Sequence, residues 1–104
     1  LLYDIAKYSI NGNLERYATI ARTIGAADEG DSDKDASEAL PAYIESLNQR
    51  LNIPRLRNLL NNDKELYEGR FDSMAQAALD SGSPQNNPVV PLHSEIVELY
   101  QAAW

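Results

Sequence analysis

The stretch LERYATIARTI, residues 14–24, decides the fold because its apolar residues recur at helical spacing. Five of them fall on one face: Leu14, Tyr17, Ala18, Ala21 and Ile24. Charged and threonine side chains gather on the opposite face, as in an amphipathic helix with one buried side. The preceding Asn13 suits an N-cap, and the following Gly25 suits the left-handed residue that ends many helices. The sequence therefore predicts a helix over residues 14–24.

Similar spacing recurs on both sides of this helix. It predicts further helices over residues 1–9, 33–52, 71–80 and 93–104. Pro41 lies inside the longest of them, where a proline removes one backbone hydrogen bond and is expected to kink the helix unless the helix begins later. No segment alternates as a strand does. We therefore expect an all-α bundle of about five helices that forms a single domain over residues 1–104.

The segments between these helices carry weaker signals. Residues 55–60 suggest a short turn, and residues 61–70 suggest a loop with one helical turn. Residues 81–91, SGSPQNNPVVP, hold three of the five prolines and show no signal for regular structure. Loops of this length are uncommon unless they have a function, and binding groups concentrate on loops held by a rigid scaffold. Residues 81–91 are therefore the candidate binding loop.

Composition narrows the classes of function. Nine basic and sixteen acidic residues give a net charge of −7, and the lack of a basic stripe argues against nucleic-acid binding. No apolar run approaches the ~20 residues that span a bilayer, and the first residues lack the pattern of a signal peptide. The chain has no cysteine, which removes disulfides and thiolate metal sites and favours the cytoplasm.

Residues with catalytic chemistry are scarce. His93 is the only histidine, and we expect it at the start of the last helix in a structural or capping role. No glycine-rich phosphate loop occurs. Packing is the expected role of Met74 and of the tyrosines at positions 3, 8, 17, 43, 67 and 100. The chain is therefore expected to contain no catalytic, cofactor-binding or metal-binding residue.

The acidic segment GAADEGDSDKD, residues 25–35, raises a calcium-binding alternative. A calcium loop of the EF-hand type needs ligands at alternate positions, a central glycine and a closing glutamate. The aspartates at positions 28, 31, 33 and 35 do not meet this pattern. Ser32, with an acid three residues later, instead resembles the start of a capped helix. A solvated loop that leads into the third helix is the preferred interpretation.

Four segments together carry a resemblance to a known family: LERYATIARTIG, ALPAYIESLNQRLNIPRLRNL, MAQAALDSG and NNPVVPLHSEIVELYQAAW. In this order they resemble the C-terminal half of the all-helical domain of iron-dependent (type III) alcohol dehydrogenases. The resemblance covers essentially the whole chain. The closing IVELYQAAW is most similar to members that reduce lactaldehyde or oxidise propanediol. Asn52 stands where the family commonly has glycine, and both residues suit a left-handed position.

The resemblance implies a metal- and NAD(P)-dependent oxidoreductase with a nucleotide-binding N-terminal domain and a helical C-terminal domain. In that family one aspartate and three histidines hold the iron or zinc, and none of these ligands matches a residue of this chain. The chain would then be a truncated C-terminal domain that is inactive alone. Its partner would be the missing N-terminal part of the same enzyme, and a homo-oligomer is also possible.

The resemblance also gives the candidate loop a role. In the family, the loop before the last helix approaches the substrate end of the cleft between the domains. The matching residues here are Ser83, Asn87 and Pro88. The alternative is that the prolines only stiffen a connector.

A different class of function also remains open at this point. The chain could be a stand-alone acidic helical module for protein interaction, with PQNNPVVP docking as an extended proline-rich ligand.

Overall fold

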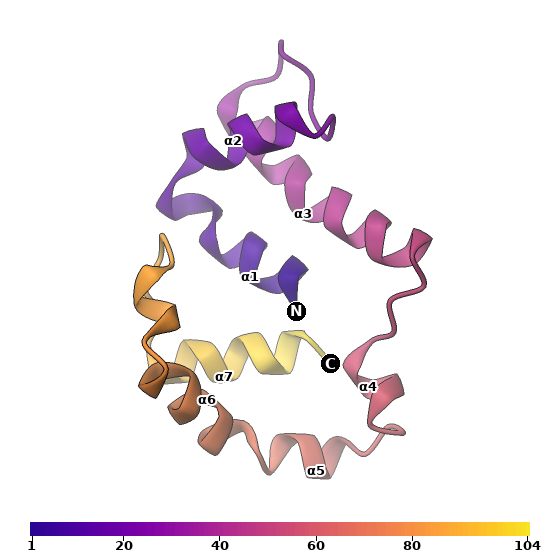
Figure 1. The fold of residues 1–104 in the computed structure, drawn as a ribbon, viewed down its shortest axis with the longest axis vertical. Coiled ribbons are helices and arrows are strands. Elements are labelled where there is room, and N and C mark those ends of the chain that lie inside the picture. The colour runs from indigo at the N-terminus through magenta and orange to yellow at the C-terminus, as the bar shows by residue number, and fades with distance from the viewer. The chain divides into compact units, whose positions relative to one another are not determined.

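The structure, a computed structural model, describes all of residues 1–104 and contains helices and turns but no strand. The α-helices are α1 (Leu2–Ser9), α2 (Leu14–Thr23), α3 (Asp33–Arg50), α4 (Leu56–Leu59), α5 (Lys64–Glu68), α6 (Phe71–Asp80) and α7 (His93–Ala102) (Figure 1). Two 3₁₀ turns, η1 (Ile10–Gly12) and η2 (Ser83–Asn86), complete the elements. The all-α prediction is confirmed.

The helices fall into two compact units. One comprises Leu2–Ile53, and the other comprises Pro54–Trp104 together with Leu1. The five longest helices correspond to the five predicted ones. The expected turn at residues 55–60 is the single-turn helix α4, and the single helical turn expected within residues 61–70 is α5. The side chain of Asp63 caps α5 by accepting a hydrogen bond from the N–H of Leu66 at 3.0 Å.

In the unit Leu2–Ile53, α2 and α3 pack along each other (Figure 1). Their contact is built from small side chains, because Ala18 and Ala21 of α2 and Ala36 of α3 are completely buried. Leu40 of α3 is also buried, at 6% exposure. Helix α1 packs against α3 as well and buries Ala6. Alanine at such contacts allows helix axes to approach closely.

The ends of α2 follow the sequence signals. Oδ1 of Asn13 accepts a hydrogen bond from the N–H of Arg16 at 3.2 Å. Beyond the C-cap, Gly25 adopts φ +80° and the N–H of Ala26 donates to the carbonyl of Ala21 at 2.8 Å. Together with the bond from the N–H of Gly25 to the carbonyl of Arg22 at 3.2 Å, this bond forms a Schellman motif, in which Gly25 is the residue with positive φ. The predicted cap and stop of this helix are therefore confirmed.

Helix α3 ends in the same way, two residues before the predicted end at Asn52. Asn52 adopts φ +54°, and the N–H of Ile53 donates to the carbonyl of Asn48 at 2.9 Å. Asn52 therefore occupies a left-handed position, as expected for a residue that stands where the family commonly has glycine. Pro41 does not interrupt the helix, which begins at Asp33 behind the N-cap Ser32. Pro41 is buried, and because proline has no N–H, α3 lacks one backbone hydrogen bond at this position.

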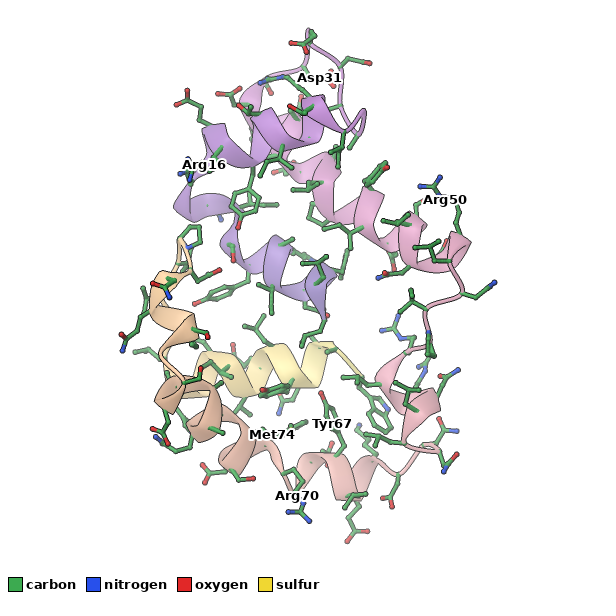
Figure 2. All side chains as sticks on the ribbon, in the orientation of Figure 1. Arg16, Asp31, Arg50, Tyr67, Arg70 and Met74 are labelled. Carbon is green, nitrogen blue, oxygen red and sulfur yellow. The ribbon has the colours of Figure 1, made fainter.

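In the unit Pro54–Trp104, aromatic rings join α5, α6 and the end of the chain. The ring of Tyr67 meets Phe71 edge-on at 4.8 Å and stacks on Trp104 at 5.1 Å. Phe71 also stacks on Tyr100 at 6.4 Å. Figure 2 shows Tyr67 and Met74 on the side of their helices that faces α7 and Arg70 pointing away. Tyr67 is buried, while Met74 and the other tyrosines are half-buried, so all contribute to packing.

Candidate functional site

The candidate loop, residues 81–91, connects α6 to α7 and is more ordered than its sequence suggests. Ser83–Asn86 form η2, a turn that the sequence did not predict. Gly82 starts it with φ +76°, and Pro84 supplies a fixed φ in its first turn. The missed signal was a glycine followed closely by a proline, which is a helix-start pattern that can also serve a single turn.

Hydrogen bonds within the loop hold its shape. The side-chain amide nitrogen of Asn87 donates to the carbonyl of Val89 at 2.6 Å, and the backbone N–H of Asn87 donates to the carbonyl of Pro84 at 3.1 Å. At the start of the loop, the hydroxyl of Ser81 donates to the carbonyl of Ala78 at 2.6 Å. Pro91 is buried at its end. Residues 81–91 are thus a braced connector.

The three predicted site residues differ in what they present. Ser83 and Pro88 are exposed, whereas Asn87 is half-buried and uses its amide nitrogen within the loop. Exposed Ser83 can offer a hydroxyl to a ligand, and Pro88 can offer a rigid apolar surface. All three lie on one short segment, but this geometry alone does not form an enclosed binding site.

The start of α7 anchors the far end of the loop. Nε2 of His93 lies 3.2 Å from Oδ1 and 3.3 Å from the backbone carbonyl of Asp72, in the first turn of α6. Because both partners are acceptors, Nε2 carries the hydrogen and donates. The N-cap is Leu92, whose N–H donates to Oε1 of Glu95 at 2.9 Å. His93 therefore has the expected structural role but does not cap the helix.

The acidic segment before α3 is organised by an arginine. The guanidinium of Arg22 donates to the carbonyl of Asp31 at 2.7 Å and pairs with Oδ1 of Asp33 at 2.9 Å. Asp31 in turn accepts from the N–H of Asp28 at 2.9 Å. No three His, Cys, Asp or Glu side chains of the chain converge as a metal site. The structure therefore gives the calcium alternative no support.

A groove that the sequence did not indicate lies between α1, η1 and α3. Its volume is about 340 Å³. Its polar walls include Lys7 beside Tyr3, with Glu38 and Glu45 from α3. The lining combines one cation with two carboxylates and contains no serine, cysteine or histidine nucleophile. Neither helix shows this arrangement by itself, because the groove exists only once α1 packs on α3.

The proline-rich segment is poorly suited to dock as an extended ligand. A polyproline II ligand needs an extended backbone with both prolines of its motif accessible. Here Ser83–Asn86 are coiled into η2, and Pro91, the second proline of PVVP, is buried. The structure therefore argues against the interaction-module alternative, which rested on an extended conformation of this segment.

The chain is therefore all-helical, with a braced loop before its last helix. Residues 1–104 match the profile of the Fe-containing alcohol dehydrogenase family, C-terminal part, over their whole length. The chain belongs to this family, which confirms the resemblance of its sequence motifs.

Individual relatives agree with this assignment. The chain is 34% identical to lactaldehyde reductase from Escherichia coli K12 and 33% identical to 1,3-propanediol dehydrogenase from Citrobacter freundii. Each match covers 100% of the chain and 26% of the relative. A crystal structure of 1,3-propanediol oxidoreductase superposes with a TM-score of 0.86 at 33% identity, over 99% of this chain and 26% of that one. The chain thus spans about a quarter of the length of these relatives.

The iron in the family's name has no fitting donor set here, since no cluster of three potential ligands exists. No helix has both the length and the apolar character needed to cross a membrane.

Proposed function

We propose that residues 1–104 are the C-terminal part of the helical domain of a metal- and NAD(P)-dependent alcohol dehydrogenase or aldehyde reductase. The observation that carries the proposal is the family match, which extends over the whole chain, together with a similar fold in 1,3-propanediol oxidoreductase. In this role the helices act as scaffold. Iron or zinc and the nucleotide would be held by residues outside 1–104, and the chain alone would be inactive.

The loop of residues 81–91 would border the substrate cleft. Its bracing supports this role, because groups that contact a substrate act best when their backbone is fixed beforehand. Ser83 and Pro88 would contact the substrate, and Asn87 would hold the backbone between them. The substrate would be a short alcohol or aldehyde, as the names of the relatives suggest. The absence of cysteine fits a reducing compartment, and we propose the cytoplasm.

The test begins with the coding sequence upstream of Leu1. We expect the reading frame to continue into a nucleotide-binding loop and a histidine-rich segment. The encoded polypeptide, supplied with Fe²⁺, should then reduce NAD(P) in the presence of 1,2- or 1,3-propanediol. A start codon directly before Leu1, or a folded longer polypeptide with no alcohol-dependent reduction, would overturn the proposal.

The loop is tested in the same polypeptide with a matched pair of variants. Asn87→Ala removes the bond to the carbonyl of Val89, whereas Asn86→Ala changes an exposed neighbour. We expect Asn87→Ala to raise KM for the alcohol and Asn86→Ala to leave it unchanged. If the two variants change KM equally, the loop does not border the substrate cleft.

A further inference from the structure

We propose that the outer face of α2, formed by Tyr17, Ile20 and Ile24, is an interface covered by the polypeptide that precedes Leu1. The inference rests on the proposed function, since it requires the longer enzyme. It goes further because it assigns a specific surface of this chain to the contact.

The sizes of the residues on α2 are distributed in an unusual way. The side that packs on α3 holds the completely buried Ala18 and Ala21, which are its smallest side chains. The larger Ile20 and Ile24 are 42% and 43% exposed on another side, and Tyr17 is half-buried beside them. Spacings of three and seven residues place these three on one face. A helix that buries alanines and exposes isoleucines has a second apolar side to cover.

The border of this face is less polar than its sequence suggests. The hydroxyl of Thr23 donates to the carbonyl of Thr19 at 2.7 Å, and that of Thr19 donates to the carbonyl of Glu15 at 3.0 Å. Both hydroxyls therefore bond within α2. Arg16 is the nearby charged residue, and Figure 2 shows it pointing outward from the start of the helix.

The connectivity of the chain favours the preceding polypeptide as the occupant. About three quarters of each relative lies outside the matched part, and the matched family region is C-terminal. A preceding segment would join at Leu1, and α1 and η1 lead from there directly into α2. Such a tether gives the segment a high effective concentration at the α2 face. A second copy lacks that tether and shares the net charge of −7, so the copies repel each other.

The experiment places a photoreactive benzophenone amino acid in the longer polypeptide in place of Ile20. A second protein carries the same group in place of Glu15, an exposed residue whose spacing of five from Ile20 places it on the far side of α2. After irradiation, peptide mass spectrometry identifies which residues became linked. We expect a link from position 20 to residues before Leu1 of the same molecule and no such product from position 15.

The other outcomes overturn the inference. A product of doubled mass would mean that a second copy covers the face, and no linked peptide at position 20 would mean that water covers it. NAD(P) reduction with propanediol is measured on the same samples. Activity without a link before Leu1 would retain the proposed function and overturn only the interface, whereas a link without activity would do the reverse.

Discussion

At the scale of single residues, Arg22 determines how the acidic segment between α2 and α3 is held. Its side chain is only 18% exposed and bonds to both Asp31 and Asp33. We expect Arg22→Leu to lower the free energy of unfolding by about 1–3 kcal/mol, because it removes hydrogen bonds that involve charged groups. Urea denaturation measures this loss. Arg16→Leu, an exposed arginine on the same helix, should change stability by less than about 0.5 kcal/mol.

Gly82 is a residue whose backbone conformation excludes most side chains. Its φ is +76°, and an added Cβ would meet no atom within 4 Å, so a substitution there tests backbone strain alone. We expect Gly82→Ala to cost about 1–2 kcal/mol. Gly30 also has open space around it but lacks a positive φ, so Gly30→Ala should be neutral or stabilise by up to about 1 kcal/mol. Thermal unfolding of the two variants would contradict this account if their midpoints shift equally.

At the scale of elements, α3 shows that a hydrophobic pattern identifies a face better than it ranks the residues on it. Leu40 and Leu47 are seven residues apart, which places both on one face of α3, yet Leu40 is 6% exposed and Leu47 is half-buried. We expect Leu40→Ala to cost about 2–5 kcal/mol, since it leaves a cavity. Leu47→Ala should cost about half as much or less, because its site can still be reached by water. Chemical denaturation that gives Leu47→Ala the larger loss would reverse this ranking.

The aromatic contacts between α5 and α7 allow a second test at this scale. The hydroxyl of Tyr67 donates to the carbonyl of Tyr100 at 2.7 Å, while its ring stacks on Trp104. Tyr67→Phe keeps the ring and removes the hydroxyl, so we expect a loss of about 1 kcal/mol. Tryptophan fluorescence follows the unfolding directly. The control is Tyr43→Phe, at a half-buried tyrosine of α3. It should not shift the unfolding transition that tryptophan fluorescence reports.

The helices could be predicted because their signals are local. Asn13, Gly25 and Ser32 mark ends through bonds to residues a few positions away, and the structure forms those bonds. The contact of His93 with Asp72 could not be predicted, since it joins residues 21 positions apart. The turn η2 was missed because residues 81–91 have no helical period. Loop residues can be nominated from a resemblance to a family, but their contacts depend on how α6 and α7 pack.

At the scale of the whole molecule, the proposed function assigns the chemistry and the scaffold to different parts of the polypeptide. Residues 1–104 supply helices, a braced loop and an exposed apolar face, but no cluster of metal ligands. Residues that only support a site can diverge as long as the backbone geometry is kept. The chain is only 34% identical to lactaldehyde reductase, and its fold matches 1,3-propanediol oxidoreductase with a TM-score of 0.86 at 33% identity. A fold kept at such low identity fits a supporting role.

This division leads to an exchange experiment with a relative. We expect lactaldehyde reductase from Escherichia coli to keep its activity when its matching C-terminal 105 residues are replaced by residues 1–104. The rate should stay within about tenfold, or about 1.4 kcal/mol of barrier, since the scaffold is similar and the rest of the enzyme is unchanged. The reductase without its C-terminal segment is the control and should be inactive. A chimera with the melting temperature of the reductase but no activity would contradict this expectation. It would indicate that the loop of residues 81–91 does not accept the substrate of the reductase. Restoring the reductase's own loop in that chimera should then recover the rate.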